Sequence, residues 1–277
     1  MSITSGSVAA ITGAGSGIGR ALAVKFADEG IAGIAIADIN REGLEGTGDL
    51  LTGKGIRFTK TILDVSDLQA IEKWAESVVG EFGLVTHLVN NAGVGLVGRT
   101  DEVSFDDMRW LMDINFWGTV YGTKVFLPLM KEQGHGHIVN ISSVFGLMAP
   151  PGQATYCASK FAVRGFTESL RHELDGTEVY ASCVHPGGVR TNIVRQARKG
   201  ENAPEEDKRI APIIFDKVAR TTPEDAADTI IRGIKAKNPR ILIGSDAAQM
   251  SAILRLFPKR YFKIMDRISG GMLSKFR

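Results

Sequence analysis

The stretch Thr12-Gly13-Ala14-Gly15-Ser16-Gly17-Ile18-Gly19 decides the fold. It follows a short apolar run and leads into a helix-forming segment that ends at Glu29. Glycines in such a turn let a pyrophosphate approach the backbone N–H groups at the start of a helix. Asp38 ends the next apolar run, about 20 residues further on, which is the spacing of dinucleotide-binding βαβ units. The stretch therefore predicts a strand, a phosphate-binding turn and a helix.

The same alternation continues along the chain. Helix-length segments begin near Gly17, Arg41, Asp67, Phe105, Thr155 and Pro223. Seven apolar runs are predicted as strands: Val8 to Thr12, Ile34 to Asp38, Ile56 to Asp64, His87 to Asn91, His137 to Ile141, Val179 to His185 and Arg240 to Ile243. This pattern is typical of an α/β fold with a doubly wound parallel seven-stranded sheet in three α/β/α layers. Ligands bind beyond the carboxyl ends of such strands, so we expect the chemistry there.

Composition indicates a folded globular protein. Of the 277 residues, 44% are hydrophobic and 23% are charged, and the formal net charge is +2. No Pro/Gly/Ser-rich linker divides the chain, so we expect residues 1–277 to form a single dinucleotide-binding domain. A nucleic-acid partner usually needs a strongly basic domain or patch, so we expect no nucleic-acid binding.

The cysteines, the first residues and the apolar stretches of the sequence bear on where the protein works. Cys157 and Cys183 cannot build a disulfide framework, and the first residues lack the basic start and apolar run of a secretory signal. We therefore expect a cytoplasmic protein. No uninterrupted apolar stretch reaches the roughly 18 residues that a membrane-spanning helix needs, so we expect no transmembrane segment.

Asp38 bears on the choice of cofactor. At the end of the second strand its carboxylate should accept hydrogen bonds from an adenosine ribose and repel a 2′-phosphate, which favours NAD over NADP. Position 39, where an arginine could neutralise such a phosphate, is Ile39. Arg20 and Arg41 are close enough in sequence to keep NADP open as the alternative, although solvated helix faces would also explain them.

A second group of residues suggests proton transfer. Tyr156 and Lys160 are four residues apart, so they share one face of a helix. An ammonium close to a phenol favours the phenolate and lowers a pKa that is ordinarily about 10. Such a tyrosine can take a proton from an alcohol, and a hydroxyl such as that of Ser143 can hold the substrate oxygen.

Together these motifs resemble the short-chain dehydrogenase/reductase family. Ser143 lies thirteen residues before Tyr156, as the family expects, and the resemblance covers roughly residues 6–245. The matching motifs are TGxxxGxG at residues 12–19, NNAG at residues 90–93, the asparagine at Asn115, the serine at Ser143, YxxxK at residues 156–160 and PGxVxT at residues 186–191.

The resemblance implies a Rossmann fold and hydride transfer between NAD and a secondary alcohol or ketone. It implies that Tyr156 is the general acid/base and that Lys160 lowers its pKa and binds the nicotinamide ribose. Ser143 would hold the substrate oxygen. Asn115 is similar to the family residue that holds a water in a proton relay reaching Lys160. The resemblance also implies assembly as a homotetramer or homodimer through the helices that contain Asn115 and Tyr156.

The resemblance further implies a set of cofactor contacts. Asp64 and Val65 would meet the adenine, and Val189 and Thr191 the nicotinamide carboxamide. The complete predicted cofactor set is Gly13, Gly15, Ser16, Gly17, Ile18, Gly19, Asp38, Asp64, Val65, Asn91, Ala92, Gly93, Tyr156, Lys160, Pro186, Gly187, Val189 and Thr191. His135 and His137 lack the partner residues of a metal motif, so we expect no metal.

A long segment after the sixth predicted strand resembles the family's substrate lid. It spans residues 191–222, with a polar middle and the apolar run Ile210 to Phe215. Together with Phe145, Leu147 and Met148 it would suit a hydrophobic alcohol or ketone as the small-molecule substrate, although these three residues would equally suit a core.

Residues 246–277 form a basic amphipathic extension. From residue 250 onward there are seven basic residues against one acid, a net of +6, which leaves +2 minus 6, or −4, for the rest of the chain. Leu254, Phe257, Tyr261, Ile264 and Ile268 recur at helical spacing, and Pro258 suits the start of a second short helix. The extension could pack on a subunit, cover the active site or contact an anionic membrane surface.

Two other functions stay open at this point. One is an NADPH-dependent carbonyl reductase, which Asp38 argues against. The other is a non-catalytic dinucleotide-binding sensor or scaffold, and the presence of both Tyr156 and Lys160 argues against it. The sequence does not name the substrate.

Overall fold

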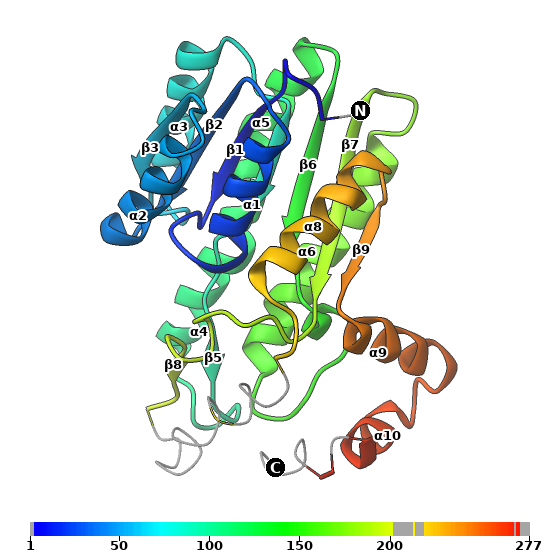
Figure 1. Ribbon diagram of the computed structural model, residues 1–277. Coiled ribbons are helices and arrows are strands. Elements are labelled where there is room, and N and C mark those ends of the chain that lie inside the picture. The colour runs from blue at the N-terminus through cyan, green and yellow to red at the C-terminus, as the bar shows by residue number, and fades with distance from the viewer. Residues whose placement is uncertain (1–2, 202–212, 214–218, 269, 272–277) are drawn as a thin grey trace.

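A parallel sheet forms the centre of the molecule. The computed structural model describes residues 3–201, 213, 219–268 and 270–271. Within them, seven parallel strands are ordered β3-β2-β1-β4-β6-β7-β9 (Figure 1). The chain winds outward from β1 to one edge and from β4 to the other, so the topological switch point lies between these two strands. The predicted doubly wound sheet is confirmed.

The strands lie close to where the apolar runs predict them. They are β1 (Val8–Thr12), β2 (Gly33–Asp38), β3 (Phe58–Ile62), β4 (His87–Asn90), β6 (Gly136–Ile141), β7 (Val179–Pro186) and β9 (Arg240–Ile243). Two further short strands, β5 (Leu96–Val97) and β8 (Arg198–Lys199), pair in parallel outside this sheet and were not predicted.

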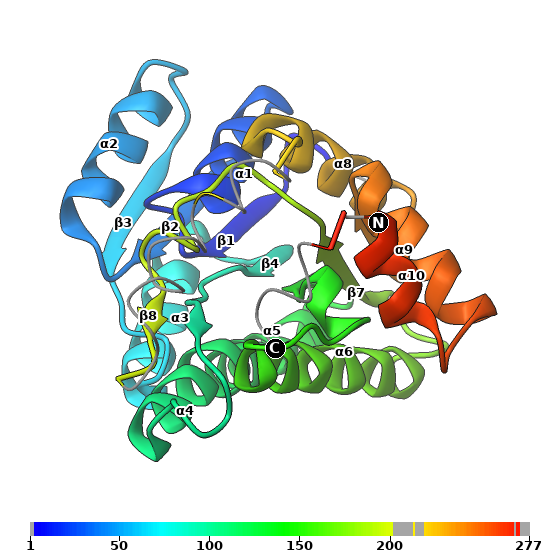
Figure 2. The same ribbon diagram turned by 90° about the horizontal axis from the view of Figure 1, so that it is seen from below.

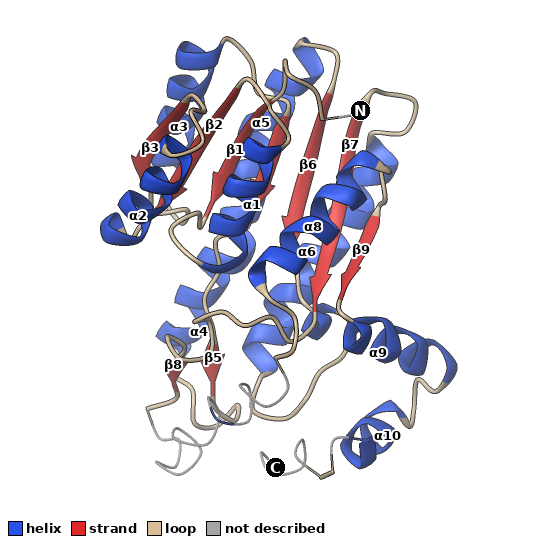
Figure 3. Ribbon diagram, viewed as in Figure 1, coloured by secondary structure: helices blue, strands red, loops and turns tan. Residues whose placement is uncertain are grey.

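The helices cover both faces of the sheet (Figure 3). They are α1 (Gly17–Asp28), α2 (Arg41–Thr52), α3 (Leu68–Phe82), α4 (Phe105–Met112), α5 (Gly118–Glu132), α6 (Ala154–Glu173), α8 (Pro223–Lys235), α9 (Ser245–Leu256) and α10 (Tyr261–Ile268). A π-helical turn η1 (Asp113–Trp117) joins α4 to α5, and a 3₁₀ turn η2 (Val144–Gly146) follows β6. The segment that begins at Phe105 is therefore three consecutive elements.

Two apolar cores hold the layers together. On one face, Phe26 of α1, Leu51 of α2 and Ile230 of α8 pack with the strands. On the other face, Trp74 of α3 and Phe126 of α5 meet edge to face, with ring centroids 5.3 Å apart. Burying each such side chain contributes roughly 1.5–3 kcal/mol, so the apolar side chains supply most of the stabilisation of both layers.

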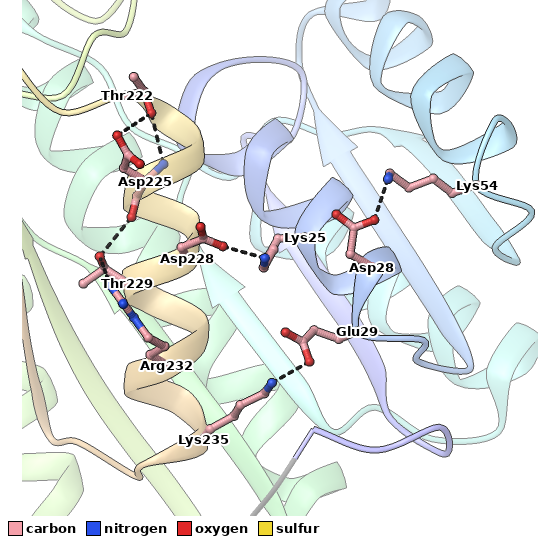
Figure 4. A network of polar contacts seen from close by, with 10 residues as sticks. All are labelled: Lys25, Asp28, Glu29, Lys54, Thr222, Asp225, Asp228, Thr229, Arg232 and Lys235. Carbon is pink, nitrogen blue, oxygen red and sulfur yellow. Dashed lines mark hydrogen bonds and ion pairs between the residues drawn. The ribbon is translucent and has the colours of Figure 1, made fainter.

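Ion pairs border the contact of α8 with α1 (Figure 4). Lys25 pairs with Asp228 at 2.6 Å, and Lys235 pairs with Glu29 at 2.5 Å. These pairs are partly exposed, so solvent screens them and they add little to stability. They link α8 to α1, and Thr221, two residues before α8, pairs with Val189.

The C-terminal helices lie beyond the carboxyl ends of β7 and β9 (Figure 2). Pro258 lies in the turn before α10, which begins three residues later, at Tyr261. In the part of the chain that the structure describes, no helix combines the length and apolarity that crossing a bilayer requires.

Candidate active site

The glycine-rich turn after β1 is tightly packed. Gly13 has a φ of +65°, and a Cβ there would lie 2.7 Å from the Cα atom of Ala92. A Cβ on Gly19 would lie 2.2 Å from the carbonyl oxygen of Gly13. Neither position accepts a side chain, so these glycines bring the turn against the loop that follows β4.

Asn91 ties these two loops together. Its side-chain amide donates to the carbonyl oxygens of Thr12 and Gly13, at 3.0 Å each. Its backbone N–H donates to the Thr12 hydroxyl, also at 3.0 Å. The predicted cofactor residue Asn91 therefore has a positioning role in the turn itself.

The start of α1 is suited to an anion. Ser16 occupies the N-cap position without making a side-chain capping bond, and the first turn holds no acidic residue. By contrast, α2, α3, α4 and α8 begin with capping side chains, as at Asn40 and Thr222. The first N–H groups of α1 thus fit the pyrophosphate of a dinucleotide.

Asp38 is fixed beside the same turn. One carboxylate oxygen accepts from the Gly15 N–H at 2.8 Å, and the other accepts from the Asn40 N–H at 2.8 Å. A Cβ on Gly15 would lie 2.8 Å from this carboxylate. The remaining lone pairs can accept ribose hydroxyls.

Arg20 is engaged within the protein. Its guanidinium donates to the carbonyl oxygens of Gly15 and Gly43 and to the Thr47 hydroxyl. These contacts hold the turn against α2, so the side chain serves the fold. Arg41 is exposed at the first position of α2.

The predicted adenine residues shape the loop after β3. Asp64 accepts hydrogen bonds from the N–H and hydroxyl of Ser66, at 2.9 and 2.7 Å. Val65 is buried, and a Cβ added at Gly118 would lie 2.8 Å from its side chain. Gly118 thereby lets α5 approach this loop.

Residues 186–191 cross over the glycine-rich turn. Val189 forms a parallel bridge with Thr221, and the Arg190 N–H donates to the Thr221 carbonyl at 2.9 Å. A Cβ on Gly17 would lie 3.0 Å from the Thr191 methyl. The predicted nicotinamide residues Val189 and Thr191 thus follow β7 and return across the start of α1.

Asp246, in the first turn of α9, holds this segment in place. Its carboxylate accepts from the Gly188 N–H at 2.7 Å, and a Cβ on Gly187 would lie 2.3 Å from it. The sequence analysis did not single out Asp246. An acidic residue two positions after Gly244, at the start of a helix, was the available signal.

The four predicted catalytic residues come from three elements. Tyr156 and Lys160 lie on α6, Ser143 caps η2, and Asn115 lies in η1. Lys160 is only 3% exposed; its ammonium donates to the Ile141 carbonyl at 3.1 Å and lies 5.8 Å from the centroid of the Tyr156 ring. A Cβ on Gly93 would lie 3.2 Å from Asn115 Oδ1 and 3.4 Å from Lys160 Nζ, so Gly93 lies between these residues.

The π-helical turn directs Asn115 inward. Asn115 is fully buried; its amide donates to the Val94 carbonyl at 3.0 Å and to the Ser159 hydroxyl at 3.2 Å. Its Oδ1 accepts from the Val94 N–H at 2.8 Å. π-Turns insert an extra residue into a helix and occur often at functional sites. Helical periodicity in the sequence does not reveal this insertion.

Burial shifts both proton-transfer groups away from their charged forms. It raises the pKa of Tyr156 to about 12, and the interaction with the Ser143 hydroxyl offsets part of this rise. Burial lowers the pKa of Lys160 to about 8. In the protein alone, desolvation outweighs the other influences on Tyr156, and the Lys160 ammonium donates to the Ile141 carbonyl. That Lys160 lowers the Tyr156 pKa once a cofactor is bound stays a prediction.

His185 makes a hydrogen bond to the backbone of Ser143. Its Nδ1 lies 3.0 Å from the Ser143 carbonyl oxygen, and burial lowers its pKa to about 4. A neutral imidazole can donate this hydrogen bond from Nδ1. His185 is therefore a positioning residue for Ser143.

The apolar residues after Ser143 have different surroundings. Phe145 meets the Tyr156 ring edge to face, with centroids 6.2 Å apart. Leu147 and Met148 are buried and belong to the core. Residues 202–212 and 214–218 of the predicted lid lie outside the described residues.

Arg198 anchors the described part of that segment. Its guanidinium lies over the Trp110 ring, 3.6 Å from the centroid, and pairs with Asp107 at 3.0 Å. β8 thereby joins α4 as well as β5. Sequence reasoning missed this contact because Arg198 and α4 are far apart along the chain.

Comparison with known proteins identifies the family. Residues 7–202 match the short chain dehydrogenase family. The oxidoreductase SadH of Mycobacterium tuberculosis is 42% identical over 279 residues, covering 100% of this chain and 98% of that protein. Estradiol 17-beta-dehydrogenase 11 of Homo sapiens is 31% identical, covering 95% of this chain and 83% of its own length.

Solved structures of short chain dehydrogenases resemble this chain as well. A short chain dehydrogenase/reductase from Burkholderia phymatum, in complex with NAD, is 33% identical with a TM-score of 0.86, covering 92% of this chain and 95% of that one. A short chain dehydrogenase from Mycobacterium paratuberculosis, bound to NAD, is 28% identical with a TM-score of 0.75, covering 88% and 98%. The chain belongs to the short-chain dehydrogenase/reductase family. It is an NAD(P)-dependent oxidoreductase with a Rossmann fold.

Proposed function

We propose that the protein interconverts a hydrophobic secondary alcohol and its ketone with NAD as cofactor and Tyr156 as general acid/base. The observation that carries this proposal is the meeting of Ser143, Tyr156 and the buried Lys160 beyond the carboxyl ends of the strands. A bound nicotinamide ring supplies or accepts the hydride. The protein's own residues bind the substrate oxygen and move the proton.

Tyr156 handles the proton at the substrate oxygen. In reduction its phenol donates to the carbonyl oxygen, and in oxidation it takes the proton of the hydroxyl. The Ser143 hydroxyl holds that oxygen by a hydrogen bond. Because burial raises the Tyr156 pKa to about 12, the phenol holds the proton that it would donate in carbonyl reduction.

Lys160 and Asn115 connect this proton to solvent. A Lys160 pKa of about 8 allows the ammonium to lose or regain a proton near neutral pH. Asn115 fixes the Val94 backbone beside Lys160 through two hydrogen bonds. We assign these residues to a proton relay between Tyr156 and solvent.

The choice of NAD rests on Asp38. Its carboxylate faces the glycine-rich turn through the Gly15 N–H, where a 2′-phosphate would meet its charge. Arg20, which could otherwise neutralise that phosphate, already donates to two carbonyl oxygens and a hydroxyl. The NAD-bound structures of the two related proteins support the same choice.

We propose that copies of the chain assemble through the helices around the site. Phe105, Trp117 and Phe161 are exposed apolar residues on α4, η1 and α6. Such residues suit a homodimer or homotetramer interface. Light scattering after size exclusion measures the mass directly.

Titration with NADH and NADPH tests the cofactor assignment. Energy transfer from tryptophan to the reduced nicotinamide reports binding without requiring a substrate. We expect NADH to bind at least tenfold more tightly than NADPH, since tenfold corresponds to about 1.4 kcal/mol. Asp38→Ala should reduce this difference, and an unchanged preference would reject Asp38 as its source. An absorbance screen with apolar secondary alcohols and ketones then tests turnover.

A further inference from the structure

The turn between α9 and α10 presents apolar side chains to solvent. Leu256 is 70% exposed and Phe257 is 49% exposed, and both lie just before Pro258. Ile268, at the end of α10, is 62% exposed. Clustered exposed apolar residues mark interaction surfaces more often than isolated ones do.

Five exposed cations lie in the same stretch of chain, from the end of α9 through α10. They are Arg255, Lys259, Arg260, Lys263 and Arg267. Between these five side chains and any acidic group in the described part of the chain, no ion pair forms. On α1 and α8, by contrast, Lys25 and Lys235 are each paired with a carboxylate (Figure 4). Within the described residues, these five cations of the C-terminal helices therefore have no acidic partner, and an external anion can meet them.

The C-terminal helices are attached firmly to the catalytic domain. Met265 of α10 and Ala247 of α9 are buried, and Asp246 binds the Gly188 N–H. α9 also packs against η2, the turn that follows Ser143. The exposed surface thus lies at the same end of the sheet as the candidate active site (Figures 1 and 2).

We propose that this surface docks onto an anionic phospholipid bilayer. We define the docking surface as Leu256 and Phe257 with the exposed cations Arg255, Lys259, Arg260, Lys263 and Arg267 of α9, the turn and α10. Leu256 and Phe257 enter the boundary between headgroups and acyl chains, and the cations contact lipid phosphates. A protein partner would need acidic groups matched to these cations, whereas an anionic bilayer offers both negative charge and an apolar layer. Provided the proposed function holds, docking places the active site where an apolar substrate concentrates.

Co-sedimentation of the full chain with vesicles tests the docking. The vesicles contain phosphatidylcholine alone or mixed with phosphatidylglycerol, at low and at high salt. We expect binding to the anionic vesicles at low salt, weak binding to phosphatidylcholine, and loss of binding as salt screens the charges. No substrate or turnover is needed, so a failure of the proposed function leaves this test unaffected.

Charge reversal locates the surface. Arg260→Glu with Lys263→Glu should reduce partitioning by at least tenfold, because each cation near an anionic surface contributes roughly fivefold. The matched control is Lys73→Glu with Lys131→Glu, which changes the net charge equally at exposed positions on α3 and α5. The control should bind as the unaltered protein does. NADH binding and circular dichroism verify the fold of both variants.

Removing the apolar tip separates insertion from charge attraction. Leu256→Ser with Phe257→Ser should weaken binding several-fold and leave its salt dependence in place. Failure of the unaltered protein to sediment with anionic vesicles at low salt would overturn the proposal. So would equal binding by the charge-reversed variant and its control. If charge reversal changes the mass in light scattering while vesicle binding is unchanged, the surface joins copies of this chain instead.

Discussion

The two ends of β4 and β6 differ in what their buried titratable groups can do. At the amino ends, His87 and His137 are register partners with ring centroids 6.4 Å apart. At the carboxyl ends, the chain continues into the loops that hold Gly93 and Ser142 beside Lys160. Burial lowers the pKa of both histidines to about 3 and that of Lys160 to about 8, so the same physical cause acts at both ends.

The difference lies in what surrounds these groups. The Phe26 ring packs on His87 and the Tyr180 ring on His137, which closes the amino end. At the carboxyl end, Tyr156 is only half-buried and Gly93 keeps the backbone without a side chain beside Lys160. A shifted pKa therefore marks a functional site only where the strand ends leave room for a ligand.

Removing the Tyr156 hydroxyl should have the largest effect. With Tyr156→Phe we expect kcat to fall roughly 10²- to 10⁴-fold, because the proton donor is lost. NADH binding and the melting temperature should change little. The matched control is Tyr180→Phe at the closed amino end, which should retain activity. A Tyr156→Phe enzyme with full activity would contradict the proposed mechanism.

Lys160 tests whether burial tunes the proton relay. In the unaltered enzyme the rate of alcohol oxidation should rise as pH passes about 8, where Lys160 loses its proton. Lys160→Arg keeps the charge but does not titrate in this range, so we expect roughly 10²-fold lower activity without that rise. Lys237→Arg, at the amino end beside Tyr180, is the control. A pH profile of kcat that keeps its inflection near 8 in Lys160→Arg would exclude Lys160 as the titrating group.

The comparison also explains what the sequence could predict. Apolar runs ended by polar residues located all seven strands of the central sheet, and the rule that parallel strands present ligands at their carboxyl ends agrees with the place of Ser143, just after β6. The π-turn that orients Asn115 was missed because it breaks helical periodicity. The rise that burial causes in the Tyr156 pKa was not foreseen, because desolvation depends on packing, which spacing along a helix does not report.

Contacts between distant segments were equally hidden. Arg198 stacks on Trp110, and Asp246 binds the Gly188 N–H, across 88 and 58 positions of sequence. Neither contact follows from a local pattern. Both hold segments that border the site, so its supporting contacts were less predictable than its reacting groups.

The histidines should affect stability more than activity. Their native pKa values of about 3 lie below the ordinary 6.5, so between these pH values the unfolded chain binds more protons. Stability is then fully present above pH 6.5 and falls as the pH drops towards 3, by on the order of 1.4 kcal/mol per pH unit for each histidine. Urea unfolding at a series of pH values measures this slope.

Two substitutions sharpen this last test. His137→Gln can keep the bond that Nε2 makes to the Ser182 hydroxyl at 2.8 Å, and His87→Asn can keep the bond of Nδ1 to the Thr86 hydroxyl at 2.8 Å. In each ring the other nitrogen is buried without a hydrogen-bond partner in the described part of the chain, so protonation there would bury an unpaired donor. The double variant should unfold with a flatter pH dependence between 3 and 6.5. If the free energy of unfolding of the double variant kept the same pH dependence, the acid sensitivity would come from other groups. The two histidines would then not account for the behaviour of the amino ends of β4 and β6.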